Sequence, residues 1–402
     1  MDNKFSMGGT STQKYLPNLD ILKFVCAIIV VFYHTANLEV YGKTSLSNLR
    51  EIIWFVGRFV SPVECFFIIS AFFLFRKLVL LENEKGSEIL KKYIFHLMVL
   101  YIIWSIPYYH YIVKNFSGRS LFHNLASLVY QYAVTGYSLQ TWYIPSLLFG
   151  IIVVQTLSER IKNKTLLFGL FVLSAVVLLW GKAYYYLFPQ SVVIDALIKT
   201  GLISLLRSIP FIFIGMHLAR AYLGNMRNRT GDFLYWVVLG GLSLVEIYYL
   251  KINKLSLSYD FYVCICPTVY FLVRKCITGK QVTVCVKNLG KMSTIIYFSH
   301  IAIRDLILNI GQNVRNGVEF NGFVLWGLTV FFSALLALLI IKMGAKMKLF
   351  RYLYESFNRF LIISLDVLIC RYSPLLRAFP ALFISEEPHK SFYYPSCFHS
   401  QK

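Results

Sequence analysis

The chain has 402 residues, of which 57% are hydrophobic and only 15% are charged, and its mean hydropathy is +0.61. Soluble domains carry about a quarter charged residues, so this composition excludes a soluble globular protein as well as the disordered, collagen-like and disulfide-stapled classes. The formal net charge of +21 indicates basic cytoplasmic loops rather than nucleic-acid binding. The apolar runs are long and continuous, so we predict an all-α integral membrane protein and not a β-barrel.

Ten stretches are long and apolar enough to cross the hydrocarbon core, which takes about 20 residues of helix. In chain order they are 21–40, 57–75, 93–113, 142–158, 165–181, 201–223, 232–250, 256–274, 289–310 and 322–341. No cleavage site precedes the first stretch, so we expect it to be retained as a signal anchor. The segment 121–139 is apolar but carries His123, Asn124 and Gln131, which favours an interfacial or re-entrant helix over an eleventh span.

The distribution of basic residues predicts the orientation of the spans. With the N-terminus in the cytoplasm, 24 of the 40 Lys and Arg residues fall on the cytoplasmic side and 11 on the outer side. This ratio follows the positive-inside rule, so both termini are predicted to be cytoplasmic. We divide the chain into a ten-span membrane domain, 1–345, and a cytoplasmic or interfacial tail, 346–402. Four spans contain a proline that predicts a kink, at Pro107, Pro145, Pro210 and Pro267.

Ionisable side chains within the predicted spans are costly in lipid and are candidate functional groups. On the first span, Lys23 and His34 are three helical turns apart, so they share one face and lie about 16 Å apart. Glu64 stands eleven residues before the inner end of the second span, and His300 eleven residues after the inner end of the ninth. His34, Glu64 and His300 are therefore predicted to lie in one layer, with Tyr297 one turn from His300.

This layer admits a chemical and a structural interpretation. A neutral imidazole accepts a proton from an alcohol as its oxygen attacks a carbonyl, while a nearby carboxylate orients the ring. In the structural alternative, each histidine forms a hydrogen bond between helices, and Glu64 is the partner of a histidine or of a basic side chain. The residues alone leave both interpretations open.

Basic residues gather where the first three spans meet the predicted cytoplasmic face. Lys23 begins the first span, Arg76 and Lys77 follow the second, and Lys91 and Lys92 open the third. Their ammonium and guanidinium groups are suited to the diphosphate or 3′-phosphate groups of a donor molecule. The alternative is that they only fix the orientation of the spans.

Tyrosines gather at the predicted outer face, and the cysteines form no pattern. Tyr108, Tyr109, Tyr111 and 184–186 are placed to stack on sugar rings, or alternatively to form an interfacial aromatic belt. The eight cysteines show no paired spacing, so we predict neither a disulfide framework nor a metal site.

Several segments, taken in order, resemble the membrane acyltransferase-3 family. Leu19–Lys23 with Val30–His34 is similar to its opening Asp-x-x-Arg and Arg-x10-His patterns, and Val63–Phe72 to its Phe-Phe-x-x-Ser-Gly-Phe signature. Lys91-Lys92 is similar to the family's basic pair, and Trp142-Tyr143 to its Trp-Tyr-Leu element. Ile209–Gly215 is similar to its Pro-Phe-x-x-x-Gly element, and Tyr297–His300 to its Tyr-x-x-His element.

The likeness covers about residues 15–345, with two departures from the family pattern. Lys23 replaces an arginine, so the bidentate contact with phosphate becomes a point charge. Ala71 replaces a glycine, which predicts looser helix packing.

The resemblance implies transfer of an acyl group, usually acetyl, from cytoplasmic acyl-CoA to a hydroxyl of a carbohydrate. Acceptors in the family include exopolysaccharide, lipopolysaccharide, capsule and lipid-linked glycan, so a multi-pass protein of the bacterial plasma membrane is expected. By the same resemblance His34 is the catalytic histidine, and Glu64 and His300 are supporting polar residues. Lys23, Lys91 and Lys92 become donor-side basic groups, and acetyl-CoA or another acyl-CoA is the expected cosubstrate.

Two other functions fit the same residues. In a transporter or glycan exporter the buried polar groups line a translocation path, but the inverted repeats typical of secondary carriers are not found in this sequence. In a sensor or assembly subunit the family shape is kept without catalysis.

Overall fold

The computed structural model describes residues 15–35, 61–80, 86–114, 120–181, 191–223, 284–314, 321–351 and 353–354, with isolated positions between 241 and 252. Within these residues every regular element is a helix, as predicted for the all-α class. The predicted spans 232–250 and 256–274 lie outside the described residues, apart from those isolated positions. The chain divides into two compact units, 1–354 and 355–402, and all of the described residues belong to the first unit.

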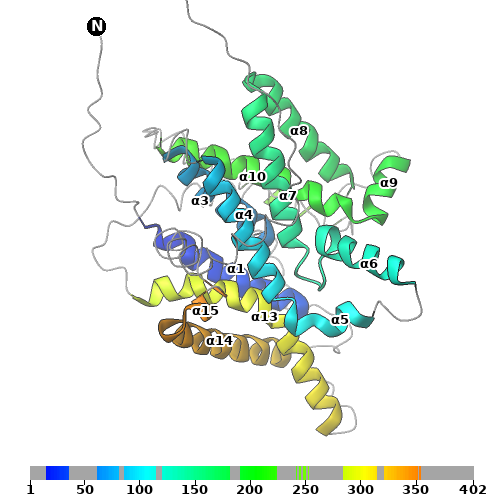
Figure 1. Ribbon diagram of the computed structural model, residues 1–402, viewed down its shortest axis with the longest axis vertical. Helices are drawn as coiled ribbons and strands as arrows, with labels where there is room; N and C mark the ends of the chain where they lie inside the picture. Colours follow the sequence, from blue (N-terminus) through cyan, green and yellow to red (C-terminus); the bar gives the residue numbers. More distant parts are fainter. Residues whose placement is uncertain are drawn as a thin grey trace, which may run out of the picture. The chain divides into compact units, whose positions relative to one another are not determined.

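The described helices follow one another along the chain in the colour order of Figure 1. They are α1 (Pro17–Thr35), α3 (Pro62–Leu80), α4 (Gly86–Ile103), α5 (Tyr109–Lys114), α6 (Leu121–Tyr130), α7 (Tyr143–Arg160), α8 (Lys164–Gly181), α9 (Val192–Lys199), α10 (Leu202–Leu223), α13 (Val284–Val314), α14 (Gly322–Lys346) and α15 (Lys348–Arg351). Among the described residues α1, α10 and α14 are long and apolar enough to cross a membrane by length and composition. The total of ten spans stays a prediction.

Four helix starts agree with the predicted spans, and two differ because the helix begins at a proline. The helices α7, α8, α10 and α14 begin within one residue of the predicted spans. The predicted start of the second span at residue 57 is wrong, because Ser61 has a left-handed φ of 46° and the helix begins at Pro62. Helix α1 likewise begins at Pro17 and not at residue 21. Proline fits the first helical position, where its missing N–H has no helical partner.

The predicted span 93–113 is wrong as a single helix. Helix α4 ends at Ile103, a 3₁₀ turn follows over Ile106–Tyr108, and the chain continues as α5. Pro107 lies in that turn, where it has no N–H to donate to the helical ladder. Pro145 produces no kink of the predicted kind, because it lies in the first turn of α7. Pro210 lies inside α10, which runs on to Leu223.

The segment 121–139 forms a short helix with an unusual end. Ten residues form α6 and the next five, Gln131–Thr135, form a π-helix. Together they measure about 22 Å, which is shorter than the hydrocarbon core of about 30 Å. No residue of α6 is buried, and the Tyr130 hydroxyl donates a hydrogen bond to the Thr200 carbonyl at the end of α9. These features support the interfacial or re-entrant interpretation.

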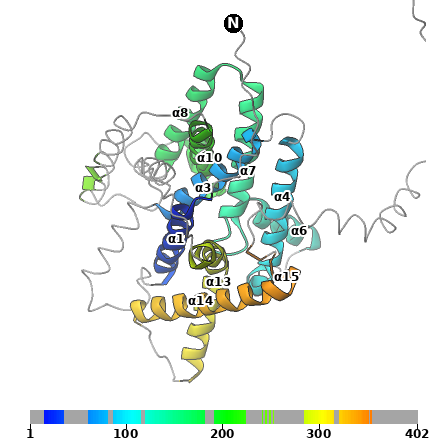
Figure 2. The same cartoon turned by 90° about the vertical axis from the view of Figure 1, so that its left-hand side faces the viewer.

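The close contact of α10 with α3 depends on one glycine. Gly215 lies against Ile68 and Ala71 of α3, and a Cβ at position 215 would be 2.5 Å from the Ile68 carbonyl oxygen. The predicted loosening at Ala71 is therefore wrong, since the facing helix supplies the small residue and Ala71 is fully buried. Helices α7 and α8 also pack on α10 (Figures 1 and 2).

Helices α1, α13 and α14 pack against one another (Figure 2). Gly290 of α13 admits the Asp20 carboxylate of α1, because a Cβ there would lie 2.4 Å from Asp20 Oδ1. The Trp326 indole of α14 donates to the Ile28 carbonyl at 3.4 Å and packs edge-on against Phe32 of α1. Helix α14 has one buried face, which consists mainly of small residues: Gly322, Leu325, Thr329, Ser333, Ala337, Ile340 and Gly344. Small residues of this kind let helix backbones approach closely in membranes.

The first residues of the predicted tail pack back onto this group of helices. Arg351 Nε donates to the Gly344 carbonyl at 2.6 Å, which satisfies one free carbonyl at the end of α14. Tyr354 is buried against Gly344, and the Lys291 ammonium group lies 5.2 Å from its ring centroid. The rest of the predicted tail, 355–402, lies outside the described residues.

We expect Gly215→Ala to lower the free energy of unfolding by about 1–3 kcal/mol, because the added methyl group overlaps the backbone of α3. In Gly169→Ala on α8 the new methyl group meets no atom within 4 Å, so a gain of about 0.5–1 kcal/mol is expected. Thermal unfolding of both variants in detergent measures the difference. Equal unfolding midpoints for the two variants would contradict the close contact.

Candidate functional site

Two imidazole rings from helices far apart in sequence lie side by side. The ring centroids of His34, in the last turn of α1, and His300, in the middle of α13, are 5.3 Å apart, with an interplanar angle of 34°. His300 is fully buried, and His34 is partly exposed. The two rings are therefore neighbours, while the predicted common layer of His34, Glu64 and His300 stays a prediction.

The hydrogen bonds of His300 leave one ring nitrogen available. Nδ1 lies 3.1 Å from the Ile296 carbonyl oxygen, so Nδ1 carries the proton and donates it to that oxygen. In the neutral ring Nε2 then keeps its lone pair. Among the described residues Nε2 has no hydrogen-bond partner, although it is buried. A buried acceptor of this kind is suited to bind a proton or a hydrogen-bond donor from a neighbouring ring or a substrate.

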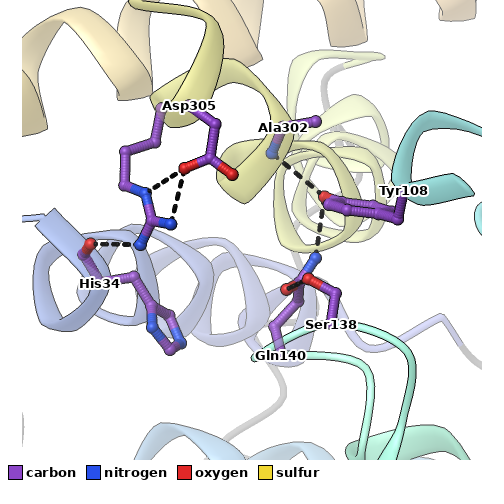
Figure 3. A network of polar contacts seen from close by, with 7 residues as sticks. His34, Tyr108, Ser138, Gln140, Ala302 and Asp305 are labelled. Carbon is purple, nitrogen blue, oxygen red and sulfur yellow. Dashed lines mark hydrogen bonds and ion pairs between the residues drawn. The ribbon is translucent and has the colours of Figure 1, made fainter. Parts of the chain in front are cut away.

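Arg304 and Asp305 connect α13 to the end of α1 (Figure 3). Arg304 lies one turn after His300, and its Nη1 donates to the His34 carbonyl at 3.1 Å. Its Nε and Nη2 both donate to Asp305 Oδ1, at 2.8 and 2.6 Å. A cation is favourable there because the last carbonyl groups of a helix carry partial negative charge. This pair was not predicted from the sequence, although a basic residue at spacing four from His300 is a signal for it.

A buried network holds the same part of α13 from another side (Figure 3). The Tyr108 hydroxyl donates to the Phe298 carbonyl at 2.5 Å, and Gln140 Nε2 donates to that hydroxyl at 2.8 Å. Tyr108 has no exposed surface, so its predicted role in sugar stacking is wrong. Tyr109 is 67% exposed and keeps that prediction, while the side chains of Tyr111 and 184–186 lie outside the described residues.

Glu64 forms an ion pair with Arg207 of α10, and both side chains are buried. The Arg207 guanidinium also lies 5.3 Å from the Trp142 ring centroid. Phe66, two residues after Glu64, packs edge-on against Tyr297 at 5.5 Å. The pairing supports the open alternative in which Glu64 is the partner of a basic side chain. Arg207 was missed as a site residue, although an arginine inside an apolar span is itself a functional signal.

The structure brings two of the predicted donor-side cations to one aromatic ring. Lys23 Nζ lies 2.7 Å from Asp20 Oδ1 and 5.7 Å from the Phe73 ring centroid. The Arg76 guanidinium lies 6.0 Å from the same ring and 5.5 Å from the Tyr222 ring. Helices α1, α3 and α10 therefore meet at this cluster.

Three further lysines lie toward the end of α3 and near the start of α4. Lys77 follows the predicted span 57–75, and its side chain is buried. This burial, together with the charge of Lys92, lowers the pKa of the Lys77 ammonium group to about 8. Lys92 Nζ lies 2.8 Å from Glu88 Oε1, and Lys91 is exposed. In the part of the chain that the structure describes, no group of three His, Cys, Asp or Glu residues is arranged to hold a metal ion.

Comparison with known proteins finds a family whose model matches most of the chain. Residues 16–384 match the protein family described as an acyltransferase domain. Over 341 residues the chain is 20% identical to an amino-acid racemase of Enterococcus faecalis, covering 82% of this chain and 46% of that protein. The chain thus spans about half the length of the curated relative it matches. No solved structure matches it.

We expect Arg207→Met to lower the free energy of unfolding by about 3–5 kcal/mol, because it leaves the buried Glu64 carboxylate without its partner. The double variant Glu64→Met/Arg207→Met should recover most of this loss, since no buried charge of the pair remains. Thermal unfolding in detergent measures both, and Lys91→Met, at an exposed position, is the control. A single variant as stable as that control would show that the pair does not stabilise the fold.

Proposed function

The chain belongs to the acyltransferase-3 family, and from this premise we propose that it transfers an acyl group, usually acetyl, from cytoplasmic acyl-CoA to a hydroxyl of a cell-surface or exported carbohydrate. Its membership makes it an acyltransferase, and its apolar helices make it a membrane protein. The observation that carries the finer proposal is the pair of adjacent imidazoles, His34 and His300, from two packed helices. We propose a multi-pass location in a bacterial plasma membrane with both termini in the cytoplasm.

In the proposed reaction His34 is the general base. Its imidazole accepts the proton of the acceptor hydroxyl as that oxygen attacks the thioester carbonyl carbon. The C–O bond forms, the C–S bond breaks, and the proton passes from His34 to the thiolate of CoA. His34 suits this role better than His300 because it is partly exposed, whereas His300 has no exposed surface.

His300 is proposed to support His34 through its unprotonated Nε2. Among the described residues this nitrogen has no hydrogen-bond partner. In the reacting complex, a ring N–H of His34 that donated to this nitrogen would fix one tautomer of His34 and direct its other nitrogen toward the acceptor hydroxyl. Glu64 acts less directly than the sequence predicted. Its carboxylate neutralises Arg207 where α3 packs on α10. Phe66, two residues after Glu64, packs against Tyr297.

The donor is proposed to bind with its phosphate groups at the cationic ends of α1, α3 and α4. Lys23 and Arg76 meet at Phe73, and Lys77, Lys91 and Lys92 stand nearby on α3 and α4. Lysine and arginine bind phosphate through charge-assisted hydrogen bonds. Because Lys23 and His34 are eleven residues apart on one helix, about 16 Å separate the phosphate end from the reacting end.

The similarity to the racemase covers less than half of that protein, so the family carries this proposal and the racemase activity does not. A transporter built on the same helices is the alternative. Flux of labelled substrate across proteoliposomes without any acyl-CoA would favour the transporter.

We expect His34→Ala to abolish acylation of surface glycans while the protein still accumulates in the membrane, because the general base is lost. Mass spectrometry of glycans from a deletion strain complemented with each variant measures the acyl content. His123→Gln, on the exposed face of α6, should leave acylation unchanged. Normal acylation by His34→Ala would remove this residue from the mechanism.

We expect Lys23→Gln to raise the KM for acyl-CoA about tenfold or more, since a charge-assisted hydrogen bond contributes about 1.5–3 kcal/mol. Steady-state kinetics of the purified enzyme at low salt, with the acceptor saturating, gives this KM. Lys162→Gln, at an exposed position between α7 and α8, is the matched control and should leave KM unchanged. An unchanged KM in Lys23→Gln would place the donor elsewhere.

A further inference from the structure

The turn of α13 that carries His300 is contacted by a side chain from outside the helix. In an α-helix the Phe298 carbonyl accepts a hydrogen bond from the Ala302 N–H. In this structure the Tyr108 hydroxyl donates to the Phe298 carbonyl at 2.5 Å and accepts from the Ala302 N–H at 3.3 Å. The hydroxyl therefore contacts both groups of one helical hydrogen-bond position, two residues before and two after His300 in sequence. Figure 3 shows its contacts with Ala302 and Gln140.

The loop before α7 holds that hydroxyl in place. Gln140 Nε2 donates both to Tyr108 Oη at 2.8 Å and to the Phe298 carbonyl at 3.3 Å. The Ser138 hydroxyl donates to Gln140 Oε1 at 2.8 Å, which orients the amide. The Tyr297 hydroxyl donates to the Gln140 main-chain carbonyl at 2.7 Å. Tyr108 and Gln140 are both buried, so water does not compete for these bonds.

This arrangement controls where His300 points. The imidazole is bound to its own helix through Nδ1 and the Ile296 carbonyl, so the ring moves with the backbone of this turn. Any rotation of the turn changes the direction of Nε2 relative to His34, whose ring centroid is 5.3 Å away. Trp104 stacks on Phe298 at 5.6 Å and limits sideways motion of the same turn.

We propose that Tyr108 and Gln140 are positioning residues for the acyl transfer, which hold the 298–302 turn of α13 so that His300 faces His34. This inference rests on the proposed function, and it adds two residues that the family resemblance did not supply. Neither residue touches the reacting atoms in this assignment. Both act through the orientation of His300.

The test is Tyr108→Phe, which removes the hydroxyl and keeps the buried ring. The kcat of the purified enzyme should fall about ten- to a hundredfold, as expected when a catalytic group is misplaced by about 1 Å. The KM values for the donor and the acceptor should both stay within about twofold, because the donor-side cations are unaffected. Gln140→Met should lower kcat in the same direction, and the double variant should lose less than the product of the two single effects.

The matched control is Tyr137→Phe. Tyr137 is a buried neighbour whose ring centroid lies 5.7 Å from that of Tyr108, and its hydroxyl also donates to a main-chain carbonyl, that of Tyr101, at 3.1 Å. Each variant removes a buried hydroxyl that donates to a main-chain carbonyl, but only the Tyr108 hydroxyl reaches the His300 turn. We expect Tyr137→Phe to keep kcat within about twofold. Equal losses of kcat in the two variants would overturn the inference and indicate a general effect on packing.

A combined variant tests whether Tyr108 acts through His300. In a His300→Gln background, adding Tyr108→Phe should produce no further loss of kcat. Full activity in His300→Gln would overturn the inference, and so would an undiminished effect of Tyr108→Phe in that background.

A measurement without turnover separates this inference from the proposed function. In protein labelled with ¹⁵N in its histidine rings, the resonances that disappear in His300→Gln belong to His300. These resonances should shift in Tyr108→Phe and stay in place in Tyr137→Phe. If the wild type transfers no acyl group, the proposed function fails while this result still decides the positioning role. If the wild type is active and the His300 resonances do not shift in Tyr108→Phe, only the inference fails.

Discussion

The packing of α1 along α13 is the constraint on which the candidate site depends, because each helix supplies one imidazole. The two helices are fixed at two levels. Near the start of α1, Gly290 makes room for the Asp20 carboxylate, and near its end the Arg304 guanidinium binds the His34 carbonyl. A glycine at one level and a cation at the other set both the separation and the register of the helices. The meeting of His34 and His300 follows from that register.

The polar groups inside this helical protein are stabilised in pairs and networks, because burial of an unpaired charge is strongly unfavourable. Glu64 binds Arg207 across α3 and α10, and Arg304 binds its neighbour Asp305. His300 Nε2 is one of several buried side-chain atoms without a hydrogen-bond partner among the described residues, and its ring lies beside a second imidazole. A buried group left available in this way is what a reacting site requires, and the surrounding pairs keep it in position.

In the proposed reaction, helix α1 links the region that binds the donor to the region that carries the general base. One end lies in the cluster of cations around Phe73, which suits phosphate, and the other end carries the imidazole. The Tyr108–Gln140 network then shows how segments from two other parts of the sequence contact the same turn of α13.

The sequence by itself determined the features that depend on local order. Continuous apolar runs give helices because backbone groups in lipid must be bonded within the segment, and eleven-residue spacing places Lys23 and His34 on one face by helix geometry. It did not determine that Glu64 would bind Arg207, that Tyr108 would be buried, or that Pro107 would end a helix where Pro210 lies within one. Those outcomes depend on which helices face each other and at what angle. Only the tertiary structure decides them, because the choice of hydrogen-bond partner between groups 143 or 190 residues apart is set by packing and not by periodicity.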